Sequence, residues 1–179
     1  MHAQWPWPAP DDDGAASHLV AGTTLPAIAL PSTAGVDIDV SKIAGRVVLF
    51  VYPFTGTPGS ANPPGWDDIR GAHGSTPEAE GFRDMMPGYA LRGVKVFGLS
   101  AQRSADQELF ARRAAITFPL LSDAAFAFAD ALRLPRFETG GVTYLKRLTM
   151  IVGDGVIEQT IYPVHPPHTH AADILRALS

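Results

Sequence analysis

The stretch VVLFVY, residues 47–52, is an unbroken run of β-branched, aliphatic and aromatic residues between Gly45 and Pro53. Such a run is typical of a strand that is buried on both faces in the middle of a sheet. A long segment rich in glycine and proline follows it, and a helical pattern then runs from about residue 76 to residue 91. The sequence therefore predicts a central strand whose carboxyl end leads through a loop into a helix.

The alternation of strand and helix continues along the chain. The further elements that we expect are a hairpin within 23–45, a strand at 94–100, a helix at 105–115, a short extended piece at 119–123, helices at 124–132 and 171–178, and a hairpin of strands 147–152 and 156–162 around Gly153-Asp154-Gly155. Parallel strands require crossover connections, whereas a hairpin adds antiparallel strands. Together these elements predict an α/β protein of thioredoxin-like fold, in which helices flank both faces of a mixed sheet.

The amino-terminal residues differ in composition from the rest of the chain. They include two Trp-Pro pairs and three consecutive aspartates, so we expect residues 1–21 to form a disordered or extended arm. Trp5 and Trp7 could dock on a groove or on a partner subunit. The remaining residues, 22–179, have a length that suits one domain with a sizeable core.

Composition argues against several classes of protein. The net charge is −4 and the lysines and arginines are scattered, so we expect no nucleic-acid partner. No apolar run approaches the ~18 residues of a membrane span, and the amino terminus lacks the basic and apolar regions of a secretory signal. We therefore expect a cytoplasmic protein without a membrane partner. The chain has no cysteine, which excludes disulfide bonds.

The loop of residues 53–74 is long for a compact domain, and such loops are usually functional or inserted. The helix after it opens with Ser75-Thr76-Pro77-Glu78, which fits a capping box with proline in the first turn. In the simplest interpretation Ser75 is a helix N-cap, which stabilises a helix by ~0.5–2 kcal/mol. A helix start behind a buried strand is also where α/β sheets bind ligands.

Two stretches of the chain resemble the active-site motif of the peroxiredoxins. Residues 52–59, YPFTGTPG, resemble its opening, Pro-x-x-x-Thr-x-x-Cys, and residues 75–84, STPEAEGFRD, resemble its continuation, Cys-Thr-x-Glu-x-x-x-Phe-Arg-Asp. The segments VKVFGLSAQ, FPLLSD and KRLTMIVGDGVI resemble later parts of the same family, of the alkyl hydroperoxide reductase type; the last resembles the strand that carries the family's active-site arginine. The resemblance covers residues 22–178 and implies the peroxiredoxin form of the thioredoxin-like fold.

The chain departs from the family pattern in two ways. An insertion near residues 59–74 splits the motif, so the upstream half places Ser60 at the cysteine position and the downstream half places Ser75 there. We prefer Ser75, because it opens the helix. Neither residue is a cysteine, and Glu80 stands where some relatives that resemble this sequence carry a second cysteine.

These departures remove the family's chemistry. Peroxide reduction needs a thiolate, and a thiol pKa near ~8.5 is lowered further by a helix N-terminus and an arginine. The sulfur then accepts oxygen reversibly as a sulfenic acid. A serine hydroxyl is barely ionised at neutral pH, and its oxygen has no matching oxidation step. We therefore predict that this chain has no thiol-peroxidase activity.

Polar residues of the motif nevertheless remain. By resemblance, Pro53 would shield the site, Thr57 would hydrogen-bond the substrate, and Arg147 would polarise it, while the helix N-terminus offers N–H donors to an oxyanion. The alternatives are a strand arginine paired with Glu78 or Asp84, a loop histidine at 73 and a solvated helix residue at 80. The candidate catalytic residues are Ser75, Arg147, Thr57, His73 and Glu78, and the candidate ligand-binding residues are Pro53, Tyr52, Ser60, Trp66, Glu80 and His165.

The run His165-Pro-Pro-His168-Thr-His170 brings three imidazoles together in sequence, as in some Zn or Ni sites. Two prolines stiffen the run, no cysteine or nearby aspartate completes a ligand set, and Thr169 fits the N-cap of the last helix. We predict no metal and no cofactor, although His165 could line the pocket if its loop folds over it.

Three functions are compatible with these residues. The first, which we favour, is a repurposed non-redox enzyme that acts on a small biosynthetic molecule by acid–base or electrostatic catalysis, such as cyclisation or isomerisation. The second is a non-catalytic binding or regulatory module. The third is a hydroperoxide reductase inactivated by serine in place of cysteine. We expect a homodimer whose partner is a small-molecule substrate or ligand.

Overall fold

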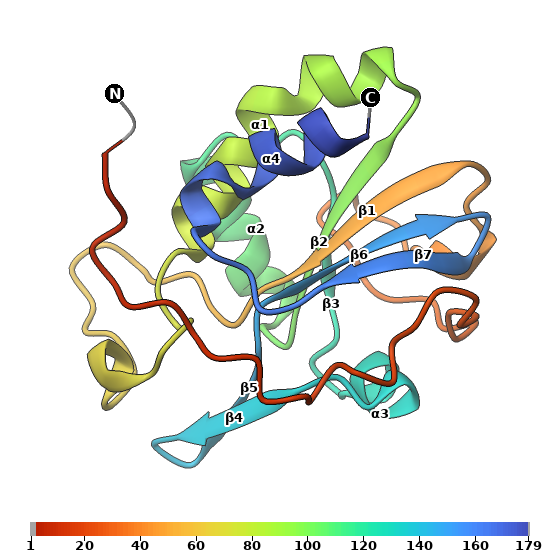
Figure 1. Ribbon diagram of the computed structural model, residues 1–179. Helices are drawn as coiled ribbons and strands as arrows, with labels where there is room; N and C mark the ends of the chain where they lie inside the picture. Colours follow the sequence, from red (N-terminus) through yellow and green to blue (C-terminus); the bar gives the residue numbers. More distant parts are fainter. Residues whose placement is uncertain (1–2, 179) are drawn as a thin grey trace.

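The run of residues 47–52 forms the central strand of a five-stranded sheet, in the order β3-β2-β1-β6-β7 (Figure 1). The structure is a computed structural model that describes residues 3–178. The strands of the sheet are β1 (Arg46–Val51), β2 (Lys95–Ser100), β3 (Leu120–Ser122), β6 (Leu148–Gly153) and β7 (Val156–Ile161). β1, β2 and β3 are parallel to one another, whereas β6 is antiparallel to both of its neighbours, β1 and β7. The predicted thioredoxin-like fold with a mixed sheet is confirmed.

Helices cover both faces of this sheet. They are α1 (Ser75–Leu91), α2 (Ser104–Arg113), α3 (Ala127–Leu132) and α4 (His170–Ala177), with single 3-10 turns at Val40–Lys42, Trp66–Asp68 and Pro167–Thr169. The crossovers β1-α1-β2 and β2-α2-β3 advance in the same direction, so both helices lie on one face, where α4 joins them. The other face packs against α3 and the chain before β1.

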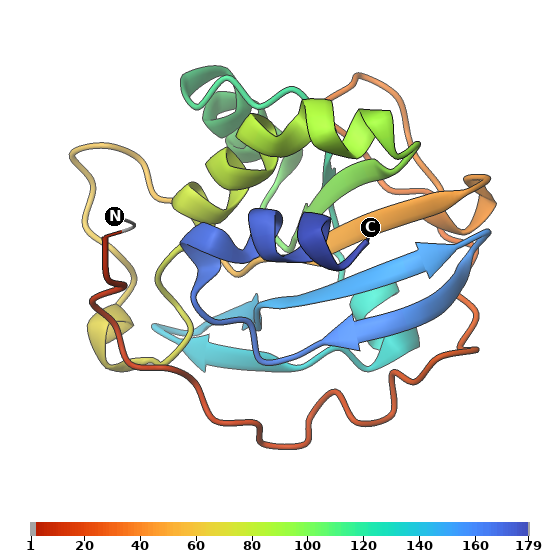
Figure 2. The same ribbon diagram turned by 45° about the horizontal axis from the view of Figure 1, so that its top comes forward.

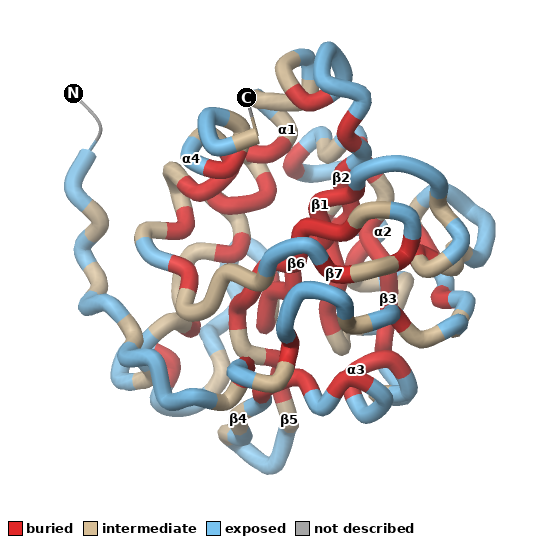
Figure 3. Tube along the Cα trace, turned by 45° about the vertical axis from the view of Figure 1, so that its right-hand side comes forward, coloured by how far each residue is buried: buried red, intermediate tan, exposed pale blue. Residues whose placement is uncertain are grey.

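The alternation of side chains along β1 supplies both cores. Phe50 points to the α1 face, where its ring stacks on Phe82 with centroids 4.5 Å apart. Leu49 points to the opposite face, into the core that contains Phe128 of α3. Figure 3 shows the buried residues concentrated in the strands and on the inner sides of the helices. No helix within residues 3–178 is long and apolar enough to cross a membrane.

The register of the sheet determines where the site forms. Val51, the last residue of β1, pairs with Leu148, the first residue of β6. Arg147 directly precedes Leu148, and therefore lies beside the carboxyl end of β1. The chain leaves β1 at the same edge and returns to begin α1 there (Figure 1).

A second hairpin, β4 (Arg136–Thr139) with β5 (Val142–Leu145), was not expected from the sequence. It turns through Gly140 and Gly141, whose φ angles of +59° and +75° glycine adopts without steric cost. The hairpin contributes Phe137 and Tyr144 to an aromatic cluster with Phe54 and Trp66. This cluster anchors the long loop before α1.

The amino-terminal arm takes the extended form of the two that we considered. Residues 3–13 run along the surface, next to the loop of residues 60–70 (Figures 1 and 2). The last part of the predicted arm of residues 1–21 packs into the core, where Ala16 and Leu19 are buried. Burial of these two apolar side chains is favourable and stabilises the ordered backbone around them.

Gly98 of β2 provides a test of packing between the strands and α1. A Cβ atom at residue 98 would lie 2.7 Å from Leu120 Cδ2 and 2.9 Å from Phe50 Cζ, both buried. We expect Gly98→Ala to lower the free energy of unfolding by about 1–3 kcal/mol in urea titrations. Gly56→Ala is the control, since its nearest contact would be an ordinary 3.6 Å. Equal losses in the two variants would contradict the packing argument.

Candidate functional site

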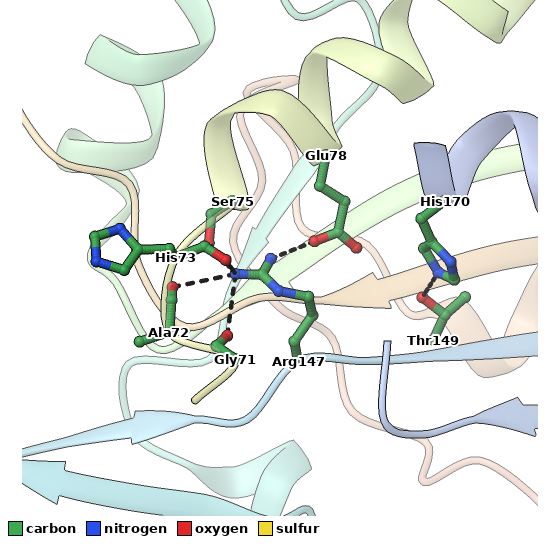
Figure 4. A network of polar contacts seen from close by, with 8 residues as sticks. All are labelled: Gly71, Ala72, His73, Ser75, Glu78, Arg147, Thr149 and His170. Atoms are coloured by element: carbon green, nitrogen blue, oxygen red, sulfur yellow. Dashed lines mark hydrogen bonds and ion pairs between the residues drawn. The ribbon is translucent and has the colours of Figure 1, made fainter. Parts of the chain in front are cut away.

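Arg147 lies at the centre of the candidate site (Figure 4). Its Nη1 donates a hydrogen bond to Glu78 Oε2 of α1, and its Nη2 donates to Ser75 Oγ at 3.1 Å. Nη2 also faces three consecutive carbonyl oxygens, of residues 71, 72 and 73, at 3.4, 3.2 and 3.2 Å. The side chains of Arg147 and Glu78 are 2% and 0% exposed. The guanidinium thus joins the start of β6 to α1 and to the segment that leads into it.

The predicted capping role of Ser75 is wrong. α1 begins at Ser75, its N-cap is Gly74 with a φ of +115°, and no side chain makes a capping hydrogen bond there. The Ser75 hydroxyl accepts from Arg147 instead, and Glu78 turns inward to the same guanidinium. A charged donor outcompetes the backbone N–H groups for both side chains, because charge-assisted hydrogen bonds are the stronger ones.

Gly74 is required by its surroundings as well as by its backbone conformation. A Cβ atom there would lie 2.3 Å from Pro167 Cγ and 2.9 Å from Trp5 Cζ2. The helix start is therefore covered closely, by the segment before α4 on one side and by the amino-terminal arm on the other.

Burial dominates the electrostatics of the pair. It raises the pKa of Glu78 from 4.5 to about 7, while the neighbouring Arg147 acts in the opposite direction. Only one oxygen of the carboxyl group is bonded: among the described residues, Glu78 Oε1 and Arg147 Nε have no hydrogen-bond partner. Burial therefore favours the protonated form of Glu78, and Arg147 favours the ionised form.

A buried histidine lies on the other side of Arg147. His170 Nε2 is 2.8 Å from the hydroxyl of Thr149, a residue of β6 (Figure 4). Burial, and secondarily the positive charge of Arg147, lower the pKa of His170 to about 4. His170 is therefore neutral at physiological pH and does not add a second cation to the site.

His73 belongs to an outer part of the site. Its ring points away from Arg147 (Figure 4), and its Nε2 lies 2.8 Å from Asp67 Oδ1. The flat face of the ring is stacked on Trp7 of the arm, with centroids 3.8 Å apart and planes 4° from parallel. We did not foresee the pairing with Asp67, because a separation of six residues within an irregular loop carries no periodic signal.

Two cavities meet at this outer part. One, of about 190 Å³, is lined by Trp5, Trp7, His73, Arg147 and the exposed His165, among others. The other, of about 250 Å³, lies in front of Ser75 and is lined also by Phe54 and Trp66. Ser75, Arg147, His73, Trp66 and His165 are thus brought together as candidate site residues.

The remaining candidates lie elsewhere. Thr57 and Ser60 are exposed, line neither cavity and make no side-chain hydrogen bond to Arg147 or Ser75. The inserted residues separate them from α1. Glu80 is half-buried on α1 and also lines neither cavity.

Pro53 and Tyr52 are buried where the chain leaves β1. The hydroxyl of Tyr52 accepts a hydrogen bond from Gln107 Nε2 at 3.5 Å, and burial raises the pKa of Tyr52 to about 12. Tyr52 is therefore a core residue in this structure and does not line either cavity.

The three histidines near α4 have separate partners. His170 contacts Thr149, while His168 faces the carbonyl oxygen of Ala3 at 3.0 Å and stacks on Trp5. His165 is exposed at the rim of the first cavity. Within residues 3–178, no three His, Asp or Glu side chains are grouped as a metal site would require.

Comparison with known proteins relates this chain to one family. Residues 20–178 match the Redoxin family. Peroxiredoxin Bcp of Escherichia coli K12 is 31% identical over 106 residues, which cover 59% of this chain and 58% of that protein. The chloroplastic peroxiredoxin Q of Sedum lineare is 27% identical over 162 residues, which cover 89% of this chain and 78% of that protein. The match spans only 58–59% of the length of the curated relatives from E. coli and Mycobacterium tuberculosis.

Solved structures agree with this relationship. The crystal structure of peroxidoxin BcpB from M. tuberculosis superposes with a TM-score of 0.71 at 27% identity, covering 90% of this chain and 97% of that one. A cysteine-to-serine mutant of Xanthomonas campestris peroxiredoxin Q superposes with a TM-score of 0.70 at 26% identity, covering 88% and 96%. With the match over residues 20–178, these findings show that the chain belongs to the redoxin family, as a peroxiredoxin-like protein without cysteine.

Proposed function

We propose that this chain binds a small organic molecule at the Arg147 site and transforms it without redox chemistry. The observation that carries the proposal is the contact of Arg147 with Ser75 Oγ at 3.1 Å, at the start of α1 and beside a cavity. The polar arrangement around the family's reactive position is present, although the chain has no thiol. An isomerisation or cyclisation that removes and returns a proton fits, because it needs no oxidant or reductant.

The residues support distinct steps of such a reaction. The N–H groups at the start of α1, with Arg147 behind them, suit an oxygen that gains negative charge in the transition state. His73, paired with Asp67 at 2.8 Å, lines the cavity and is the candidate acid–base group. Glu78 is 0% exposed and reaches a ligand only through Arg147, so its role is that of a positioning residue.

A second candidate function is that of a hydroperoxide reductase with serine in place of its cysteine. The same contact favours it, since a thiolate at residue 75 would lie beside Arg147 and the helix N-terminus. A non-catalytic binding module is a third candidate, because both terminal nitrogens of Arg147 are already bonded within the protein. The small-molecule partner and the homodimer stay predictions.

Native mass spectrometry of the purified protein tests for a co-purified ligand. We expect a bound molecule in the wild type and a loss of occupancy of about tenfold or more in Arg147→Lys, because lysine keeps the charge beside Glu78 but not the planar set of donors. Arg46→Lys is the matched control, since Arg46 pairs with Glu158 on the surface at 2.9 Å. Equal occupancy in both variants would place the ligand away from Arg147.

The raised pKa of Glu78 predicts a pH dependence of stability. The folded state holds this proton up to about pH 7, whereas the unfolded chain releases it near 4.5. The contribution to the free energy of unfolding is therefore fully present below about pH 4.5 and is lost as the pH rises to about 7.

Glu78→Gln should remove this dependence. In urea titrations from pH 4 to 8, the stability of the wild type relative to Glu78→Gln should fall with pH across that window. Glu138→Gln, at an exposed residue of β4, is the control and should keep the slope of the wild type. A wild type that gains stability relative to Glu78→Gln as the pH rises would show that Arg147 outweighs burial.

Ser75→Cys separates the first two candidate functions. We expect the introduced thiol to have a pKa below the usual ~8.5, because of Arg147 and the helix N-terminus, as measured by the ultraviolet absorbance of the thiolate against pH. Hydroperoxide consumption with a thiol reductant should nevertheless stay slow, because Thr57 does not reach the site and the arm covers it. Fast turnover of hydroperoxide would instead support the inactivated reductase.

A further inference from the structure

Two tryptophans of the amino-terminal arm lie flat on two histidines at the mouth of the site. Trp7 stacks on His73 with ring centroids 3.8 Å apart and planes 4° from parallel. Trp5 stacks on His168 at 5.2 Å and 17°. Both tryptophans line the cavity in front of Ser75 and the cavity that reaches Arg147. The arm therefore fills the approach to the helix start with two aromatic rings.

The outer part of the arm is held weakly. Within residues 3–178, no backbone-to-backbone hydrogen bond involves residues 3–12. Arg70 faces the carbonyl oxygen of Ala9 at 3.4 Å and the carboxylate of Asp11 at 3.7 Å, and Asp11 is 90% exposed. His168 Nε2 lies 3.0 Å from the carbonyl oxygen of Ala3. Exposed ion pairs such as that of Arg70 with Asp11 contribute little to stability. The rings of Trp5 and Trp7 thus provide much of the contact that keeps this segment in place.

From Asp13 onward the arm is attached firmly. The carboxylate of Asp13 accepts hydrogen bonds from Lys146 Nζ at 2.8 Å and from the Tyr162 hydroxyl at 2.7 Å. Ala16 and Leu19 are then buried in the core. Residues 3–12 can consequently swing away from the site while Asp13 stays bound, without any loss of the core.

We propose that the face of His73 is a binding site for a flat aromatic ring, that Trp7 occupies this site in the ligand-free protein, and that residues 3–12 are the lid. The inference rests on the proposed function, since it names the class of ligand for the same site. The parallel stack of Trp7 on His73 shows that a planar ring fits there, and Phe54 and Trp66 provide further aromatic walls. Asp67 contacts the edge of the His73 ring at Nε2, and this contact fixes the orientation in which the face of the His73 ring lines the cavity.

Arg147, which lies behind the ring site, determines which polar group we expect on the ligand. Arg147 lines the same cavity of about 190 Å³ as Trp7 and His73. A carboxylate or carbonyl oxygen on a ligand whose ring replaces Trp7 would lie on the side of Arg147. The expected class is therefore a flat aromatic compound with a carboxylate or carbonyl group.

Phenylacetate is a suitable probe, and cyclohexylacetate, which has the same charge and a puckered ring, is its control. We expect phenylacetate to bind Trp7→Ala about tenfold or more tightly than it binds the wild type, by isothermal titration calorimetry, because the lid no longer competes. Trp7→Phe, which keeps a flat ring, should fall between the two. Gln4→Ala, an exposed arm residue without a contact to the site, should behave as the wild type.

The outcomes against the inference are distinct. Weaker or unchanged binding of phenylacetate to Trp7→Ala would show that Trp7 is a wall of the site or has no part in it. Equal affinity for cyclohexylacetate would overturn the choice of a flat ring, and so would the absence of binding by phenylacetate to any variant. Circular dichroism of each variant verifies that the fold is intact.

Amide hydrogen exchange tests the lid without a ligand. Residues 71–78 should exchange faster in Trp7→Ala than in the wild type or in Gln4→Ala, and unchanged exchange would overturn the lid. These readouts require no turnover, so they distinguish the two proposals. If Trp7→Ala binds phenylacetate more tightly while Arg147→Lys keeps the wild-type occupancy of the co-purified ligand, that combined result would support the ring site and contradict the proposed function.

Discussion

The ion pair between Arg147 and Glu78 is the constraint on which the rest of the site depends. Both side chains are almost completely buried, so both have lost their hydration. The guanidinium recovers part of that loss from three carbonyl oxygens and the Ser75 hydroxyl, and in doing so it holds β6, the inserted loop and α1 together. Removing one partner of such a pair typically costs about 3–5 kcal/mol, because the other charge is left buried alone.

This arrangement explains how a redoxin fold keeps a polar site without sulfur. The hydrogen bonds of Arg147 serve packing as well as chemistry: they set the start of α1 and the path of the loop before it. The thiol chemistry of the family depends on one atom, whereas the donors around that atom are part of the tertiary structure. This chain has no cysteine, but it has the donors around Arg147, a neutral buried histidine and a covered cavity in front of Ser75.

Much of the fold could be predicted from the sequence, because it depends on local patterns. The apolar run at 47–52 and the turn at Gly153-Asp154-Gly155 predicted β1 and the β6–β7 hairpin correctly. The β4–β5 hairpin was missed although Gly140-Gly141 signals a two-residue turn, since each of its strands has only four residues and is too short for a clear pattern. The prediction that Ser75 caps the helix was wrong because Arg147, distant in sequence and directly before β6, donates to the same side chain.

The sequence by itself determined the α/β class, the redoxin-like motif and the absence of cysteine, because these follow from composition and short-range spacing. Only the tertiary structure decided how the candidate site residues lie relative to one another. Thr57 and Ser60 are exposed and line neither cavity. Arg147 is hydrogen-bonded to Glu78 and Ser75, and Trp7 stacks on His73. These contacts link parts of the chain more than sixty residues apart, where burial and charge, rather than local propensity, select the partner.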